Sequence, residues 1–260
     1  MLNFEMKQEG KETLVLLHGF MENLSIWEDL EKSLSKEFTL LKIDLPGHGQ
    51  SEVMGKIQSM ESMAEEVNAV IEDLELGKVH LLGHSMGGYT ALAFAEKFPE
   101  KLKSITLFFS STLADSEEKK SIRKRSLEII DTNFSLFVNT SIPNLFSENE
   151  KDILEGKINI AKEIALSTNP EGVKATQLGI AERPDRTNVL EEFQEKILII
   201  TGKQDNAVKA ETFMKHIPNK SNIKTYMLDC GHNGHWEKPE ICAAIINTEL
   251  LHNFPKHLVF

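Results

Sequence analysis

The five residues Gly83-His84-Ser85-Met86-Gly87 decide how the rest of this sequence is interpreted. They follow the largely apolar run Val79–Leu82 and precede a helix-forming run, Tyr89–Phe98. This order places a serine on a tight turn between a strand and a helix, with glycines that let the backbone turn sharply and approach its neighbours closely. We therefore expect the hydroxyl of Ser85 to be exposed beside a helix N-terminus, where the helix dipole favours developing negative charge.

Short apolar runs along the chain predict a mostly parallel β-sheet flanked by helices. Each run is nearly continuous in Val, Ile, Leu or Phe, as expected where both faces of a sheet are covered. Between two of them, apolar residues recur at helical spacing over residues 60–74, which predicts a core helix. The candidate strands are residues 14–17, 39–43, 79–82, 104–109, 197–200 and 223–228.

The alternation of strands and helices breaks between about residues 111 and 190. This stretch is mostly helical in pattern and rich in charge, so we predict an α/β core of residues 1–110 and 191–260 with a helical insertion of residues 111–190. Because arginine binds carboxylate and phosphate well, an anion-reading lid and a solvated or salt-bridged helix face both stay open. The four arginines of the chain all lie in this insertion: Arg123, Arg125, Arg183 and Arg186.

Composition limits the class of protein. A chain of 260 residues can form one large core, with or without an insertion. The net charge of −11 argues against nucleic acid or an anionic membrane as a partner, because both need a basic face. Two cysteines, Cys230 and Cys242, give no disulfide framework, and the N-terminus shows no secretory signal. No apolar stretch is long enough to span a membrane, so we expect a cytoplasmic protein.

Residues on two later loops can activate Ser85. A serine hydroxyl is a poor nucleophile at neutral pH and needs a base that is oriented by an acid. Asp205 closely follows the candidate strand 197–200, and His232 closely follows the candidate strand 223–228. Both therefore lie at the carboxyl ends of strands, where sites on parallel sheets collect. The order Ser, Asp, His is the one expected when the nucleophile sits on a strand-to-helix turn.

A tetrahedral intermediate also needs donors for its oxyanion. We expect one from the backbone N–H of Met86, the residue after the nucleophile. The second is expected from the loop 18–21, which follows the first candidate strand, with Phe20 as the donor. Since these donors are backbone groups, the side chains of this loop need not be polar.

Five blocks of sequence together resemble the α/β-hydrolase fold family across essentially the whole chain. The resemblance implies an α/β-hydrolase sheet with a helical cap inserted after strand 6. It also implies a serine esterase or enol-lactonase-like enzyme that needs no cofactor and acts on a small-molecule ester. Carbon–carbon bond hydrolases, lyases and cofactor-free haloperoxidases share the pattern and remain alternatives. The blocks are residues 17–20, 44–51, 83–88, 202–205 and 231–240.

The cap is expected to shape an apolar pocket over Ser85. The wall residues that we expect are Trp27, Phe134, Phe137 and Leu145.

Several residues compete for the roles above. Asp115 is a rival acid, although a helix cap for the segment from residue 116 is the simpler interpretation, and Asp205 is itself a candidate cap. His235 is a rival base, but the resemblance selects His232 and leaves His235 a packing or capping role. The remaining loop histidines, His18 and His48, are expected to be structural. No histidine cluster has the spacing that zinc requires, so we expect no metal site.

Overall fold

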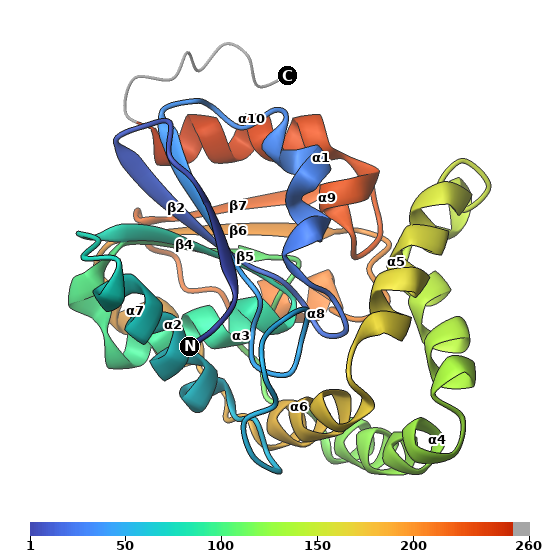
Figure 1. Ribbon diagram of the computed structural model, residues 1–260. Helices are drawn as coiled ribbons and strands as arrows, with labels where there is room; N and C mark the ends of the chain where they lie inside the picture. Colours follow the sequence, from blue (N-terminus) through green and yellow to red (C-terminus); the bar gives the residue numbers. More distant parts are fainter. Residues whose placement is uncertain (252–260) are drawn as a thin grey trace.

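A seven-stranded sheet forms the centre of the computed structural model, which describes residues 1–251 (Figure 1). The strands lie in the order β1-β3-β2-β4-β5-β6-β7, and every neighbouring pair is parallel except β1 with β3. The six predicted strands are confirmed, with ends that move by at most two residues. The strands are β1 (Phe4–Lys7), β2 (Glu12–Leu17), β3 (Phe38–Ile43), β4 (Val79–His84), β5 (Leu102–Phe108), β6 (Lys196–Gly202) and β7 (Ile223–Leu228).

Strand β1 was not predicted from the sequence. It pairs antiparallel with β3 at the edge of the sheet, from Phe4 opposite Ile43 to Lys7 opposite Leu40. Three of its four residues are exposed, so it lacks the continuous apolar run that marks the central strands. An edge strand of this length is held by backbone hydrogen bonds that leave little trace in composition.

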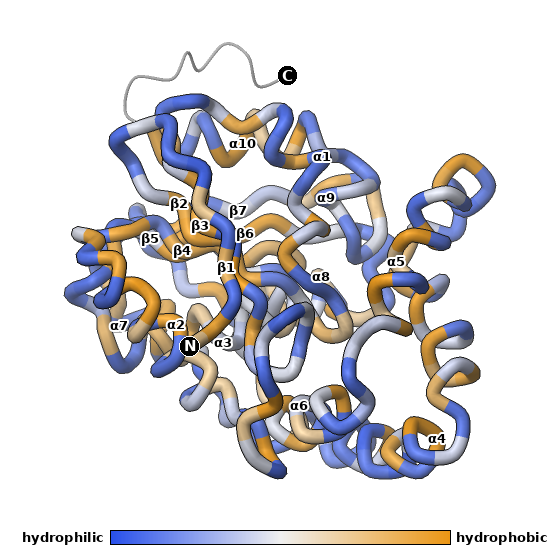
Figure 2. The backbone as a smooth tube through the Cα atoms, viewed as in Figure 1, coloured by the Kyte–Doolittle hydropathy of each residue, from blue (hydrophilic) through white to orange (hydrophobic). Residues whose placement is uncertain are grey.

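Helices cover both faces of the sheet (Figure 1). On one face lie α1 (Glu28–Glu31), α9 (Gly234–Glu237) and α10 (Pro239–Leu250), which contact one another, and on the other lie α2 (Met60–Asp73), α3 (Met86–Lys97) and α7 (Thr187–Glu192). Strand side chains alternate between two apolar clusters: Val15 joins the α2–α3 side, whereas Leu14 and Leu16 join the other. Figure 2 shows these strands as hydrophobic segments inside more polar helices and loops.

The helical insertion lies between β5 and β6, so it follows the fifth described strand, where the resemblance led us to expect the sixth. Its helices α4 (Glu117–Ser141), α5 (Glu155–Ser167) and α6 (Pro170–Glu182) stand to one side of the core (Figure 1). Helix α7 behaves differently, since it contacts α3 and buries Val189 and Leu190 in the core. The boundaries at residues 111 and 190 remain a prediction. Residues 252–260 of the predicted core segment lie outside the described residues.

Two further findings bear on the setting of the protein. Within residues 1–251, no helix combines the length and the apolar character that a membrane crossing requires. The cysteines Cys230 and Cys242 are both buried and unbonded to each other.

Candidate active site

Ser85 occupies a strained turn between β4 and α3. Its φ of 50° and ψ of −111° lie in a region that a serine rarely adopts. The backbone is held there because its N–H donates to the carbonyl of Phe108 at 3.0 Å and its carbonyl accepts from Ser110 Oγ at 2.7 Å. Ser85 is the first flanking residue of α3, but its hydroxyl makes no capping hydrogen bond. The hydroxyl is therefore available to a ligand.

The two glycines of the pentapeptide permit this turn. A methyl carbon at Gly83 would lie 2.1 Å from the carbonyl of Gly87, and one at Gly87 would lie 2.3 Å from the carbonyl of Leu17. Any larger side chain would push α3 away from the sheet. The close backbone approach predicted for these glycines is therefore present, between Gly83 and Gly87 and between Gly87 and Leu17.

Asp205 and His232 are in direct contact. Nδ1 of His232 donates to Oδ2 of Asp205 at 2.7 Å, and both side chains are buried. The other carboxylate oxygen accepts from the N–H groups of Ala207 and Val208, each at 2.8 Å, so Asp205 caps its own loop as well. Burial alone would lower the pKa of His232, but the attraction of Asp205 and the hydrogen bond between them outweigh it and raise that pKa.

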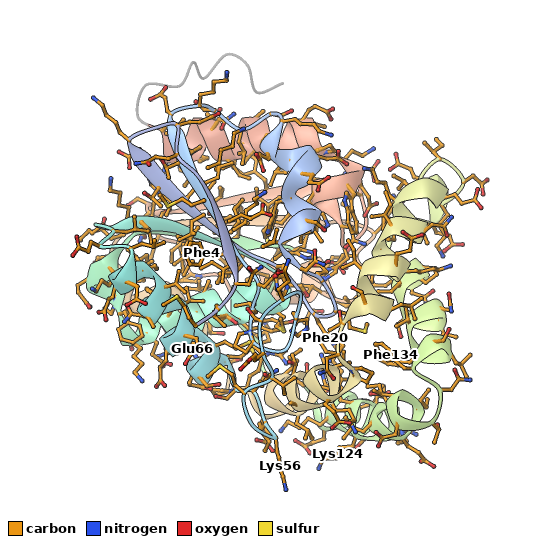
Figure 3. The ribbon with its side chains drawn as sticks, in the orientation of Figure 1. Phe4, Phe20, Lys56, Glu66, Lys124 and Phe134 are labelled. Carbon is orange, nitrogen blue, oxygen red and sulfur yellow. The ribbon has the colours of Figure 1, made fainter. Side chains whose placement is uncertain are left out.

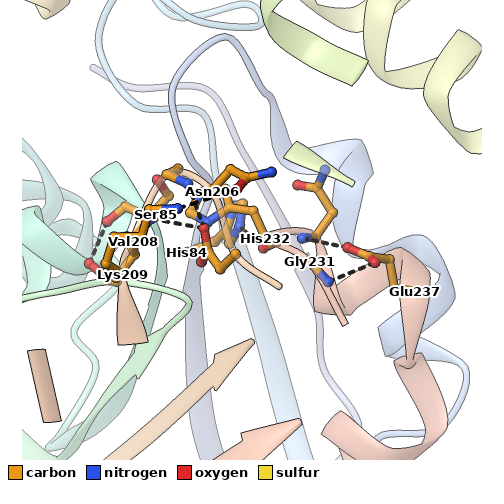
Figure 4. Close-up of polar contacts among 12 residues, drawn as sticks. His84, Ser85, Asn206, Val208, Lys209, Gly231, His232 and Glu237 are labelled. Carbon is orange, nitrogen blue, oxygen red and sulfur yellow. Dashed lines mark hydrogen bonds and ion pairs between the residues drawn. The ribbon is translucent and has the colours of Figure 1, made fainter. Parts of the chain in front are cut away.

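The loop that carries His232 is held through its backbone on every side. The N–H of His232 donates to the carbonyl of Leu145 at 2.7 Å, and its carbonyl lies 3.0 Å from Nε2 of His84. The neighbouring N–H groups of Gly231 and Asn233 donate to the carboxylate of Glu237 at 2.8 and 3.0 Å (Figure 4). The position of the imidazole is therefore fixed before any ligand binds.

The rival acid lies elsewhere. Asp115 is buried and contacts Nε of Arg123 at 2.5 Å and a terminal nitrogen of Arg183 at 2.9 Å, which lowers its pKa despite burial. The expectation that Asp115 caps the following helix is wrong. The capping side chain of α4 is Ser116, whose hydroxyl accepts from the N–H of Lys119.

The rival base, His235, is buried in the core. His235 is fully buried, and neither ring nitrogen has a hydrogen-bond partner among the described residues. Burial, and then the nearby His84, lower its pKa well below the usual value. Its ring lies 4.4 Å from that of Trp236 between centroids, which fits packing, whereas the capping role that we also considered is wrong.

The loop histidines His18 and His48 make structural contacts. Nε2 of His18 accepts from the N–H of Leu45 at 2.9 Å, and its Nδ1 lies 2.7 Å from the carbonyl of Gly19. Nδ1 of His48 lies 3.0 Å from the carbonyl of Pro46. The bond between His18 and Leu45 joins the expected oxyanion loop to the following loop, and the bond of His48 lies within that following loop, so both histidines make structural contacts.

A cavity of about 210 Å³ brings Ser85 and His232 together. Phe20 and Met86 also line it, and within residues 1–251 neither backbone N–H donates to another protein group. Phe20 lies between the core and helix α6 (Figure 3). Two residues whose backbone N–H groups have no acceptor among residues 1–251 thus line the same cavity as Ser85.

Two of the four predicted wall residues lie at this cavity. Phe137 and Leu145 line the cavity, but Trp27 and Phe134 do not belong to its lining. Trp27 is fully buried in the core, where its ring faces those of Phe108 and His235. Phe134 lies on α4 and packs against an apolar cluster that includes Ile130 and Val138 of the same helix (Figure 3). Aromatic character alone did not distinguish core packing from a pocket wall.

The arginines of the insertion divide into different roles. Arg123 lines the cavity and contacts Gln177 Oε1 at 3.0 Å in addition to Asp115. Arg183 packs 4.0 Å from the ring of Tyr89, and Arg186 pairs with Glu61 and Glu96 of the core. Of the four arginines, only Arg125 is exposed and fits the expectation of a solvated helix face.

Other cavity residues were missed. Lys119 lines the cavity, and its amine donates to the carbonyl of Ala207 at 3.3 Å. Burial and the neighbouring arginines, partly opposed by Asp115, lower its pKa. Glu22 and His84 line the cavity as well. The only signal for these two was their position, Glu22 just beyond the expected oxyanion loop and His84 inside the pentapeptide.

No metal centre competes with this interpretation in the described part of the chain. Among residues 1–251, no group of three or more His, Cys, Asp or Glu side chains is arranged to hold a metal ion.

Comparison with known proteins identifies the family. The α/β-hydrolase fold family model matches residues 12–239. The esterase of Thermogutta terrifontis, solved with malate bound, is 32% identical with a TM-score of 0.87, over 96% of this chain and 92% of that one. The enol-lactonase of Burkholderia xenovorans LB400 shares the fold, with a TM-score of 0.88 over 96% of each chain at 20% identity. The 2-hydroxy-6-oxononadienedioate/2-hydroxy-6-oxononatrienedioate hydrolase 1 of Pseudomonas putida is 26% identical over 94% of this chain and 90% of its own length. The chain belongs to the α/β-hydrolase fold family.

Proposed function

We propose that this protein is a serine hydrolase that cleaves a small to medium carboxylic ester or lactone through an acyl-enzyme on Ser85. The observation that carries this proposal is the 2.7 Å contact of Asp205 with His232, a residue that lines the same cavity as Ser85. The similarity of this chain to an esterase, at 32% identity, supports the same reaction class.

In this mechanism Ser85 attacks the ester carbonyl while His232 takes its proton. Asp205 accepts from Nδ1, which keeps Nε2 as the acceptor and stabilises the imidazolium that forms. The N–H groups of Phe20 and Met86 stabilise the oxyanion. His232 then gives the proton to the leaving alcohol, and water activated by the same imidazole releases the acid.

The cavity favours a modest substrate. Its volume of about 210 Å³ lies below the roughly 300–1,000 Å³ of pockets for drug-sized ligands. Phe137, Leu145 and Ile180 supply apolar wall, which suits a short acyl chain. We expect activity to fall as the acyl chain outgrows this space.

The test is a series of p-nitrophenyl esters of increasing acyl length, measured beside simple lactones. The wild-type protein should turn over short esters and react with a fluorophosphonate probe, whereas Ser85→Ala should do neither. A folded wild-type protein that fails to label at residue 85 would rule out the serine mechanism.

A second candidate is hydrolysis or lysis of a carbon–carbon bond in a carboxylate-bearing substrate, using the same three residues. A cofactor-free perhydrolase reaction is a further variant of this site. The observation that favours an anionic substrate is the pair of cations, Lys119 and Arg123, in the cavity lining. Two similar proteins point the same way: one acts on a dienedioate, and the esterase was solved with malate, which is also a dicarboxylate.

Arg123→Gln separates these candidates. If the cations bind a substrate carboxylate, KM for mono-p-nitrophenyl succinate should rise about tenfold while KM for p-nitrophenyl acetate stays nearly constant, because charge-assisted bonds to carboxylates are the strong ones. The control is Arg125→Gln, since Arg125 is exposed on the same helix. Equal changes in KM for both esters would rule out recognition of an anionic substrate by these cations. A direct assay with the dienedioate would then test carbon–carbon cleavage alone.

A further inference from the structure

A buried carboxylate lies in the cavity wall beside Ser85. Glu22 is only 7% exposed. Its Oε2 accepts from the N–H of Gly19 at 2.6 Å and from Nδ1 of His84 at 2.8 Å. Burial alone would raise the pKa of this carboxyl, but the attraction and the hydrogen bond of His84 outweigh burial and lower its pKa to about 2. Glu22 is therefore ionised at neutral pH.

His84 joins that carboxylate to the loop of His232. Its Nε2 lies 3.0 Å from the carbonyl oxygen of His232, and the centroids of the two rings are 4.9 Å apart (Figure 4). A carboxylate and a carbonyl both accept hydrogen bonds, so the imidazole of His84 lies between two acceptors. A buried carboxylate is costly to desolvate, which indicates a role other than stability.

The same carboxylate fixes the expected oxyanion loop. A methyl carbon at Gly19 would lie 2.7 Å from Oε2 of Glu22 and 2.9 Å from Nδ1 of His84, so the loop backbone is pressed against the pair. Glu22 occupies the N–H of Gly19. The next N–H, that of the cavity residue Phe20, has no acceptor among residues 1–251.

We propose that Glu22 and His84 form a positioning pair that holds the Gly19–Phe20 loop and the His232 loop in place on either side of Ser85. One carboxylate and one imidazole thereby link the oxyanion donor, the residue before the nucleophile and the backbone of the base. This inference rests on the proposed function, because it assigns the pair to the same reaction.

The charge of Glu22 also acts on the base. Burial lowers the pKa of His232, but the attraction of Asp205, their hydrogen bond and then the attraction of Glu22 raise it above the usual 6.5. His232 must be neutral to take a proton, so the acid limb of kcat/KM in the wild-type protein should lie above about pH 6.5. Removing the charge of Glu22 lowers this pKa and moves the limb to lower pH.

The test is Glu22→Gln, compared with Glu31→Gln. Glu31 is a matched control because its carboxylate also contacts a buried basic side chain, that of Lys42 at 3.0 Å, but lies outside the cavity lining. With p-nitrophenyl acetate, and rates normalised by active-site titration, E22Q should lose about 10- to 100-fold in kcat with little change in KM. Its acid limb should move to lower pH. E31Q should keep both at wild-type values.

Two results would overturn the inference. One is wild-type kcat in E22Q. The other is a lower kcat with an unmoved acid limb, which would mark a purely structural residue. If E22Q does not fold, Glu22→Asp keeps the charge and shortens the reach, so kcat should fall with the limb in place, and wild-type kcat there would also overturn it. Failure of the proposed function would give a different result, because the wild-type protein itself would then neither hydrolyse esters nor react with the fluorophosphonate probe.

Discussion

His232 and His235 stand three residues apart, yet their surroundings suit them to different roles. His232 contacts Asp205 and faces the cavity, whereas His235 is sealed in the core without a polar partner among the described residues. His232→Ala should therefore lower ester turnover by at least ~10³-fold, because Ser85 loses its base. His235→Ala should lower the thermal midpoint but keep kcat within about tenfold. The measurement is kcat for p-nitrophenyl acetate, and near-full activity in H232A would transfer the role of base elsewhere.

At this scale the sequence was informative where a residue type is rare for its position. A serine between two glycines and a histidine after a glycine have few structural uses, so Ser85 and His232 could be proposed as site residues from the sequence. Glu22 and Lys119 were not, because most charged residues lie on the surface and only tertiary contacts show which of them line a cavity. Trp27 shows the opposite error, since a large aromatic suits a core as well as a pocket.

The element that presents His232 is a loop tied down by one carboxylate. Glu237, from α9, accepts from Gly231 and Asn233 of that loop and from Ser147 of the insertion at 3.1 Å. In Glu237→Gln one of the two oxygens becomes an NH₂ group, so at least one buried N–H loses its acceptor. The free energy of unfolding should fall by about 1–3 kcal/mol, and kcat should fall with it. Urea denaturation and ester assays measure both effects.

Glu240→Gln is the control for that change. Glu240 lies three residues further along and is exposed, so its variant should match the wild-type protein in both assays. Equal stability of E237Q and E240Q would show that the three backbone contacts are not worth their expected free energy.

Elements were predictable in proportion to how much apolar surface they bury. The central strands carry runs that only a doubly covered sheet explains, and their ends moved by at most two residues. Strand β1 escaped because its residues are mostly exposed. The insertion was identified as helical, but its kink at Asn133, with a φ of −156°, is a local backbone departure that composition does not reveal.

At the scale of the whole molecule, the sequence predicted a core and an insertion but not how they meet. Gln58 of the core makes both backbone and side-chain contacts with α6: its N–H donates to the carbonyl of Ala175 at 3.0 Å, and its side chain donates to Thr176 at 2.7 Å. Glycines allow this close approach. From the sequence alone, a glycine inside a helical pattern indicates only a less stable helix. Which surface a helix packs against is decided by tertiary contacts that the sequence pattern does not show.

The seating of α6 on the core can be tested through one of those glycines. A methyl carbon at Gly179 would lie 1.8 Å from the carbonyl oxygen of Gln58, so Gly179→Ala must displace the helix. Overpacking of this kind costs about 1–3 kcal/mol. Because Gln177 and Ile180 of the same helix line the cavity, KM for short esters should also rise. The matched control is Gly156→Ala in α5, where a methyl carbon meets nothing within 4 Å and should add about 0.5–1 kcal/mol of stability. Thermal midpoints of the two variants should thus move in opposite directions, and a G179A protein as stable as the wild type would mean that α6 does not rest on residue 58 in solution.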